Sequence, residues 1–181
     1  MRKQIFIING SGGVGKDEFI RLVSNYIYDE CVVGNRSSVD KIKEIAKFIG
    51  WDGSKTERNR KFLSDLKLLT TEYNDMPLND MRNFADAFMN GEFNVSRMLF
   101  LHIREPEEIK KAVNEFKEYN PKTILVKRDS VKHITSNMAD ENVFNYDYDI
   151  VIDNNGTLED FVKKAKSFSD DFLNNTIKSS Y

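Results

Sequence analysis

Apolar residues occur in short runs and in helical periodicities that alternate along the chain. The run Ile5-Phe6-Ile7-Ile8 precedes a glycine-rich stretch, and a bounded apolar run of this kind predicts a buried strand over Lys3–Asn9. From Lys16 to about Glu30, apolar residues recur with helical spacing. The chain is therefore expected to begin with a strand, a glycine loop and a helix.

The same alternation continues through the rest of the sequence. Further strands are predicted at Cys31–Val33, Met98–Ile103, Thr123–Val126 and Asp149–Ile152, and further helices at Asp40–Ile49, Arg58–Tyr73, Leu78–Asn90, Pro106–Tyr119 and Leu158–Leu173. On the helix that begins at Arg58, the residues expected to face inward are Phe62, Leu63, Leu66, Leu69 and Thr70. Alternating strands and helices predict an α/β fold with a mainly parallel, five-stranded sheet between two helical layers.

Ligands in such sheets bind beyond the carboxyl ends of the strands. This rule brings together the loops that follow Asn9, Val33, Ile103, Val126 and Ile152. Functional residues are therefore expected along that edge of the sheet.

Composition limits the kinds of protein that this sequence encodes. Its 181 residues, 40% of them apolar and 31% charged, fit a single α/β domain with a substantial core. With a formal net charge of −2 and no dense block of Lys or Arg, long nucleic acid is not an expected partner. The apolar runs are far shorter than a bilayer span, so no membrane partner is expected. Cys31 is the only cysteine, which excludes an intrachain disulfide and predicts a reducing, cytoplasmic location.

The glycine loop carries the strongest chemical signal. It reads Gly10-Ser11-Gly12-Gly13-Val14-Gly15-Lys16 and matches G-x-x-x-x-G-K, the core of a phosphate-binding P-loop. Glycines let backbone N–H groups surround phosphates, and the helix that follows directs its positive end at the same anion. Lys16 is expected to reach the β- and γ-phosphates and to offset charge during phosphoryl transfer. A P-loop NTPase fold that binds ATP is therefore predicted.

A second motif overlaps the first, because Gly10-x-Gly12-x-x-Gly15 is also the dinucleotide-binding fingerprint. That fingerprint needs an acidic residue about 20 positions on, where this chain has Arg36 and only later Asp40. An arginine there would accept the 2′-phosphate of NADP, so this alternative stays open. Lys16 directly after the last glycine favours the P-loop.

Asp17 occupies the position where the general P-loop motif has Ser or Thr. A carboxylate is a good ligand for Mg²⁺ and also suits the N-terminus of a helix. Asp17 is therefore either a magnesium ligand, directly or through water, or a helix-capping residue.

Several segments together resemble the bacteriophage-type deoxynucleoside monophosphate kinases, and the loop is also similar to that of animal-type phosphomevalonate kinases. The segments are Gly15-Lys16-Asp17, Arg58–Leu63 with its early arginines, Arg104 with Glu108, His133-Ile134-Thr135, and the closing stretch Asp149–Phe161. Two positions depart from that family: His102 stands where it has Asp, and Glu18 where it usually has Thr. The resemblance implies a nucleoside monophosphate kinase-like fold, ATP and Mg²⁺ as cofactors, and a (deoxy)nucleoside monophosphate as acceptor.

Several residues are candidates for the chemistry besides the loop. Arg104 and Arg128 each follow a predicted strand, so both are expected to stabilise the charge of the moving phosphoryl group. Residues 128–146 are polar and irregular and are expected to form a lid loop. Asn154 follows the last strand and is a candidate nucleotide contact.

The acceptor is expected to bind within a helical region of about residues 36–90. The candidates there are Asp40, Arg58 and Arg60, joined by Arg104. Either Ser38 or Asp40 is also expected to cap the helix that begins at residue 40.

Three alternatives remain open at this point. The first is a P-loop protein that binds a nucleotide without catalysis, which His102 favours. The second is the NADP-binding domain already described. The third is a kinase whose phosphorylated acceptor is not a nucleotide. The partners expected in each case are small molecules, and the sequence does not specify an oligomeric state.

Overall fold

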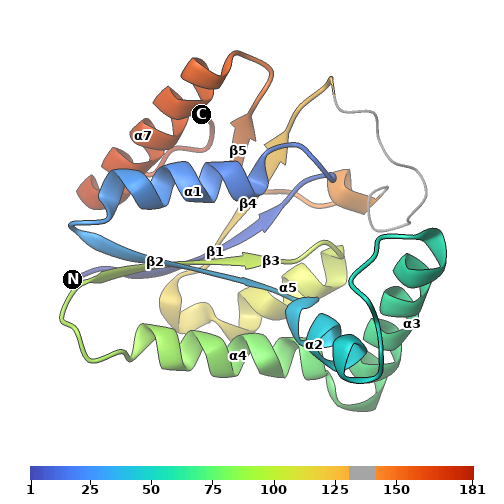
Figure 1. Ribbon diagram of the computed structural model, residues 1–181. Helices are drawn as coiled ribbons and strands as arrows, with labels where there is room; N and C mark the ends of the chain where they lie inside the picture. The colour runs from blue at the N-terminus through green and yellow to red at the C-terminus, as the bar shows by residue number, and fades with distance from the viewer. Residues whose placement is uncertain (131–141) are drawn as a thin grey trace. The chain divides into compact units, whose positions relative to one another are not determined.

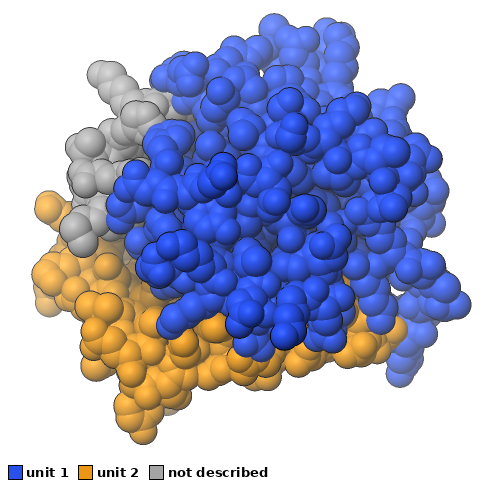
Figure 2. Space-filling model, turned by 180° about the vertical axis from the view of Figure 1, so that it is seen from behind, with its two compact units in different colours: residues 1–35, 92–181 blue, residues 36–91 orange. Residues whose placement is uncertain are grey.

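A computed structural model describes residues 1–130 and 142–181. The chain forms two compact units, one made of residues 1–35 and 92–181 and the other of residues 36–91 (Figure 2). The first unit contains the glycine loop, and the second contains the helical region predicted from the sequence. Each unit is considered separately below.

The first unit is organised by a parallel sheet with the strand order β2-β3-β1-β4-β5. Its strands are β1 (Lys3–Asn9), β2 (Cys31–Ser37), β3 (Ser96–His102), β4 (Lys122–Lys127) and β5 (Ile150–Asp153). The predicted fold class, an α/β fold with a five-stranded parallel sheet, is therefore confirmed. β2 extends to Ser37, four residues beyond the end predicted from its short apolar run.

β1 lies in the centre of the sheet because both of its faces are apolar. Ile5, Phe6, Ile7 and Ile8 have no exposed surface. A strand of a parallel sheet is covered by helices on both faces, so a continuous apolar run is expected there. β1 pairs with β3 on one side and β4 on the other, with Phe6 opposite Phe100. The loop after β1 therefore begins at the middle of the sheet's ligand edge.

Helices cover both faces of this sheet (Figure 1). α1 (Lys16–Ile27) and α7 (Leu158–Asn174) pack together on one face, and α5 (Pro106–Glu115) lies against β1 on the other. Crossovers between parallel strands are right-handed. The step from β1 to β2 and the step from β3 to β4 run in opposite directions across the sheet, so α1 and α5 are placed on opposite faces.

An aromatic cluster fills the space between the sheet and the pair formed by α1 and α7. The Phe168 ring lies 5.1 Å from the ring of Phe6, 5.2 Å from that of Phe19 and 6.4 Å from that of Phe100. Phe168 has no exposed surface. Two of these contacts are edge-on, an arrangement that aromatic quadrupoles favour. Phe168 therefore joins α7 to both β1 and α1.

Two chain segments near the C-terminus have structure that the pattern of apolar residues did not predict. η2 (Asn142–Phe144) is a short 3-10 helix within the region expected to be irregular. Ser179–Tyr181 runs beside β5, where Val151 N–H donates to Ser179 O at 2.9 Å and Tyr181 N–H donates to Val151 O at 3.0 Å. This segment covers the edge of the sheet, which would otherwise present unpaired backbone groups.

The second unit is helical and contains α2 (Asp40–Phe48), α3 (Glu57–Asn74) and α4 (Met76–Met89). No residue of α3 is fully buried, and Leu69 is 63% exposed. The prediction that Leu69 faces inward is therefore wrong. Among the described residues, α3 packs mainly against α2 and α4, so its contact stripe is narrower than the periodicity of its apolar residues indicated.

The helix ends also differ from the predictions by a few residues. α5 stops at Glu115, and the chain continues as the 3-10 helix η1 (Lys117–Tyr119), whereas one helix through Tyr119 was predicted. α7 begins with a capping box, in which the Thr157 hydroxyl accepts from Asp160 N–H and the Asp160 carboxylate accepts from Thr157 N–H.

Among residues 1–130 and 142–181, no helix is both long and apolar enough to span a bilayer.

The aromatic cluster is expected to be a main source of stability. Phe168→Ala should lower the free energy of unfolding by about 3–5 kcal/mol, because the substitution leaves a cavity where the ring contacted those of Phe6, Phe19, Phe100 and Tyr181. Phe48 is 91% exposed, so Phe48→Ala, the matched control, should change the free energy by less than about 0.5 kcal/mol. Denaturant unfolding followed by circular dichroism measures both. Similar losses for the two variants would contradict this assignment of the core.

Candidate nucleotide-binding site

The glycine loop joins the carboxyl end of β1 directly to the first turn of α1. Gly10, Gly13 and Gly15 have φ values of 144°, 82° and 104°, a region that residues with a side chain rarely adopt. A Cβ added at Gly10 would lie 2.4 Å from Val126 O. Position 10 therefore requires glycine, both because its φ is positive and because β4 passes too close to leave room for a side chain.

The buried side-chain amide of Asn154 supports the C-terminal part of the glycine loop. Asn154, only 8% exposed, donates from Nδ2 to Val14 O at 2.8 Å. A Cβ added at Gly15 would lie 2.6 Å from the same nitrogen. The structure therefore places Asn154 beneath the loop, where its side chain supports the backbone around Gly15.

A second buried amide holds the near side of the loop. Asn9, at the end of β1, accepts from Gly10 N–H at 2.8 Å through Oδ1. Its Nδ2 donates to Arg104 O at 2.9 Å and to the Tyr148 hydroxyl at 2.7 Å. The sequence analysis did not identify Asn9. The only signal was a polar residue at the end of an apolar strand.

Lys16 lies over the loop that precedes it. Its Nζ donates to Gly10 O at 2.5 Å and to Ser11 O at 2.9 Å. The ammonium group is thus held at the mouth of the loop, on the side of the α1 N-terminus. This is the position from which a P-loop lysine reaches phosphate groups.

Asp17 lies in the first turn of α1, and its side chain is 92% exposed. The residue that precedes the helix is Gly15, and no side chain caps this end through a hydrogen bond. His102, the last residue of β3, places Nε2 at 3.9 Å from Asp17 Oδ1. Within the described residues, no group of three or more acidic, histidine or cysteine side chains could hold a metal ion. Asp17 is thus an accessible carboxylate beside the loop, which fits a hard cation that also binds phosphate oxygens.

Both predicted arginines of this unit follow strands that flank the loop. Arg104 comes two residues after β3, and Asn9 binds its carbonyl oxygen. Arg128 comes directly after β4 and is exposed. The carboxyl ends of parallel strands meet at one edge, so these residues share the ligand edge with the glycine loop.

The loops after β4 and β5 are tied together by side-chain hydrogen bonds. Asp129 N–H donates to Asn155 Oδ1 at 2.7 Å, and Asn155 Nδ2 donates to Asp129 Oδ2 at 2.9 Å. Burial opposes ionisation of Asp153, but hydrogen bonds from Asn155 and nearby lysine ammonium groups outweigh it and lower the pKa of Asp153. These bonds fix the backbone on either side of Arg128 and Asn154.

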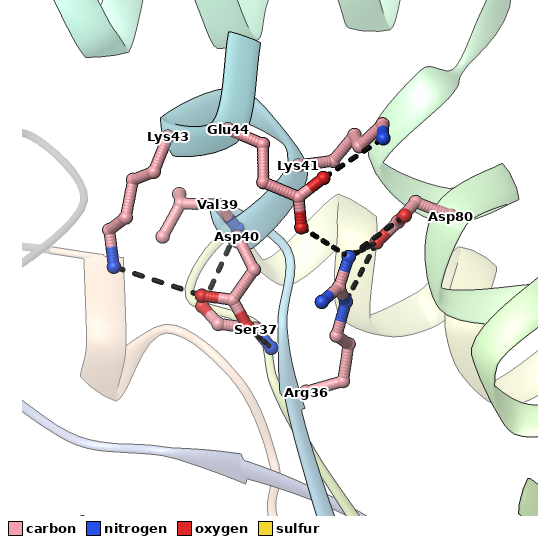
Figure 3. Close-up of polar contacts among 8 residues, drawn as sticks. All are labelled: Arg36, Ser37, Val39, Asp40, Lys41, Lys43, Glu44 and Asp80. Atoms are coloured by element: carbon pink, nitrogen blue, oxygen red, sulfur yellow. Dashed lines mark hydrogen bonds and ion pairs between the residues drawn. The ribbon is translucent and has the colours of Figure 1, made fainter. Parts of the chain in front are cut away.

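The second unit contains the other predicted acceptor residues. Asp40 is the first residue of α2, and its carboxylate accepts from Ser37 N–H at 2.7 Å (Figure 3). The residue that precedes the helix is Val39, so the predicted capping by Ser38 or Asp40 is wrong. Arg58 and Arg60 are exposed near the start of α3.

An ion pair that the sequence analysis did not predict occupies the centre of Figure 3. Arg36 donates two hydrogen bonds of 2.9 Å to the Asp80 carboxylate and a third of 3.3 Å to Glu44. Burial opposes the charge of Arg36, yet the carboxylates of Asp80, Asp40 and Glu44 together outweigh it and raise the arginine's pKa. Its guanidinium is therefore already matched by carboxylates of α2 and α4, which weakens the interpretation of Arg36 as a receptor for the 2′-phosphate of NADP.

Part of the predicted lid loop, with His133, lies at residues 131–141, outside the described residues.

The strand order and the glycine loop after the central strand are those of a P-loop NTPase fold. No protein-family model and no curated protein matches the chain. Among solved structures, it is similar to a "putative kinase" from Chloroflexus aurantiacus at a TM-score of 0.55 and 11% identity, over 96% of this chain and 97% of that one.

Two further solved structures are kinases as well. One is a sugar kinase from Janibacter sp., with a TM-score of 0.49 and 14% identity over 94% of this chain and 95% of the other. The second is a thymidylate kinase from Ehrlichia chaffeensis, with a TM-score of 0.32 and 8% identity over 100% and 93%. At such low identities the similarity concerns the fold alone. Of these three structures, the one from Chloroflexus aurantiacus has a TM-score above 0.5, and the comparison of folds rests on it.

Two glycines of the loop, Gly15 and Gly12, are expected to respond differently to substitution. Gly15→Ala should lower the free energy of unfolding by at least about 1–3 kcal/mol, because alanine is strained at this φ and its Cβ would collide with Asn154. Gly12→Ala is the matched control, since a Cβ there meets nothing within 4 Å and its φ is not positive. Thermal and denaturant unfolding of the two variants test this, and equal stabilities would contradict the geometry.

Tyr148 predicts an alkaline limit to stability. Burial raises the pKa of Tyr148 to about 12, above the value of about 10 in an unfolded chain. The folded state therefore favours the protonated phenol, and this contribution is complete below pH 10 and lost as the pH rises to 12. Stability should fall over that window, and Tyr148→Phe should reduce the fall. Unfolding curves measured from pH 8 to pH 12 test it, and an unchanged slope in the variant would refute it.

Proposed function

We propose that this protein transfers the terminal phosphoryl group of ATP to a small phosphorylated acceptor, and that this acceptor is a (deoxy)nucleoside monophosphate. The observation that carries the proposal is the loop Gly10–Lys16, set between the central strand and α1, with the Lys16 ammonium held at its mouth. The loop's backbone, the positive end of α1 and Lys16 together favour a polyphosphate.

The acceptor phosphate is itself an anionic nucleophile, so no general base is needed. One of its oxygens forms a bond to the γ-phosphorus of ATP while the bond from that phosphorus to the β–γ bridging oxygen breaks, and ADP leaves with the electron pair. In this proposal Lys16, Arg104 and Arg128 stabilise the charge that develops on the oxygens. Asp17 would hold Mg²⁺, which neutralises phosphate charge.

The unit of residues 36–91 is proposed to bind the acceptor. Its candidates are Arg58 and Arg60, which are exposed cations at a helix start, together with Asp40. Cations at this end of a helix are mildly unfavourable for the helix itself, and an anionic ligand would offset that cost. A phosphorylated metabolite that is not a nucleotide would use the same cations.

A second function is favoured by one observation. His102 stands beside Asp17, 3.9 Å away, where the family that the sequence resembles has a carboxylate. A protein with fewer magnesium ligands could bind a nucleotide without transferring phosphate.

Ligand-dependent melting temperatures and an assay of ADP formation distinguish these functions. We expect Mg·ATP to raise the melting temperature, one nucleoside monophosphate to raise it further, and that pair to yield ADP. Stabilisation by ATP with no response to any monophosphate would reject the nucleotide acceptor. Binding of ATP with no turnover across a panel of phosphorylated acceptors would favour the second function, and stabilisation by NADPH alone would reject both.

Lys16 is expected to be required for transfer. Lys16→Ala should lower kcat by at least about 100-fold, since it removes a cation from the charge that develops in the transition state. Lys110→Ala serves as the matched control, because Lys110 is an exposed residue of α5 paired with Glu107. Initial-rate kinetics at saturating ATP measure both variants. A Lys16 variant with the turnover of the wild type would show that the loop is not the site of the chemistry.

A further inference from the structure

Asn9 lies where three parts of the ligand edge meet. It ends β1, has no exposed surface, and precedes the first residue of the glycine loop. Its side chain bonds the loop through Gly10 N–H, the segment after β3 through Arg104 O, and the segment before β5 through the Tyr148 hydroxyl. One neutral side chain thus joins three segments that are far apart in the sequence.

The hydrogen-bonding pattern determines the orientation of this amide. Tyr148 uses its only proton to donate to Val143 O at 2.7 Å, so the hydroxyl can only accept from Asn9. Arg104 O is also an acceptor, and therefore both must face the nitrogen of the amide. The oxygen then faces Gly10 N–H. A flipped amide would place an oxygen against two acceptors, which a buried site does not tolerate.

Through Gly10 and Arg104, the amide acts on two of the cations that are proposed to stabilise the phosphoryl group. The Gly10 backbone oxygen accepts a hydrogen bond from the Lys16 ammonium. The Arg104 carbonyl oxygen is fixed by Asn9 at 2.9 Å, which restricts the backbone that carries the Arg104 side chain.

We propose that Asn9 is a positioning residue that aligns the glycine loop and Arg104 for phosphoryl transfer, with Tyr148 fixing the orientation of its amide. This inference rests on the proposed function. Misplacement of a reacting or stabilising group by about 1 Å costs about 100-fold in rate, so a residue of this kind affects turnover more than binding.

Asn9→Asp is the most selective substitution. It has the same shape, keeps an oxygen for Gly10 N–H and replaces the nitrogen that donates to Arg104 O with a second oxygen. Because it also introduces a buried carboxyl group, Asn9→Ala, which removes the same donor without adding a charge, should show the same fall in kcat. We expect kcat to fall by about 10- to 100-fold, while the KM for ATP changes by less than about threefold, because the loop's own amides remain.

Thr123→Val is the matched control. Thr123 is 2% exposed on β4 and also makes several side-chain hydrogen bonds, donating to and accepting from Asp149 at 2.8 and 2.9 Å. It lies at the amino end of its strand, opposite the ligand edge. Its loss should lower the melting temperature and leave kcat unchanged. Equal losses of kcat in the two variants, in proportion to stability, would show that Asn9 is only structural.

Amide hydrogen exchange provides a readout that does not depend on activity. In the wild-type protein, Gly10 N–H should exchange slowly for a loop amide, and Asn9→Asp or Asn9→Ala should accelerate exchange in the segment around Arg104. Fast exchange at Gly10 in the wild type would overturn the inference even if neither variant folds. A wild-type protein that turns over no acceptor would refute the proposed function, whereas an active wild type with an equally active, folded Asn9 variant would refute the inference alone.

Discussion

The ligand edge of this protein depends on a backbone constraint at the glycine loop. Three glycines take up left-handed conformations within six residues, and such a segment has little intrinsic preference for one shape. The loop obtains its shape from outside, because Asn9 binds its first amide and Asn154 binds the carbonyl before Gly15. Both amides are buried, where an unmade hydrogen bond is costly, so the loop is held in one arrangement. An anion-binding loop that is already arranged loses less entropy when a phosphate binds.

The parts of the fold that could be predicted are those that rest on local periodicity. β1 was recognised because a strand covered on both faces is apolar throughout, and α1 because its apolar positions repeat with the helical period. The glycine loop was recognised because its spacing has a chemical cause. The same reasoning gave the wrong burial for Leu69, since periodicity reports how many apolar residues a helix has and not how wide a surface its neighbours offer.

The parts that could not be predicted depend on contacts between distant segments. The pairing of Val151 with Ser179 joins β5 to a C-terminal segment whose own sequence shows no strand pattern. The supporting contacts of Asn9 and Asn154 could not be predicted for the same reason. The sequence gives no sign of the bonds of Asn9, and it indicates only that Asn154 is a candidate nucleotide contact. A single asparagine after a strand looks alike whether it faces a ligand or a neighbouring loop. Only the positions of Gly10, Arg104 and Val14 show where these amides are used.

The fold restricts the function without determining it, because one α/β architecture accommodates many acceptors. The charge balance at the loop limits the possibilities further. Mg²⁺ in phosphoryl-transfer sites is commonly held by one or two carboxylates together with phosphate oxygens and water. In the proposed function, Asp17 supplies one accessible carboxylate for the metal, so His102 in place of a second carboxylate does not rule the proposal out. A histidine there would leave less negative charge next to the phosphates than a carboxylate, which favours a triphosphate bound by Lys16 and Arg104. On this proposal the rate of transfer depends on how firmly these cations are held, which is the role inferred for Asn9.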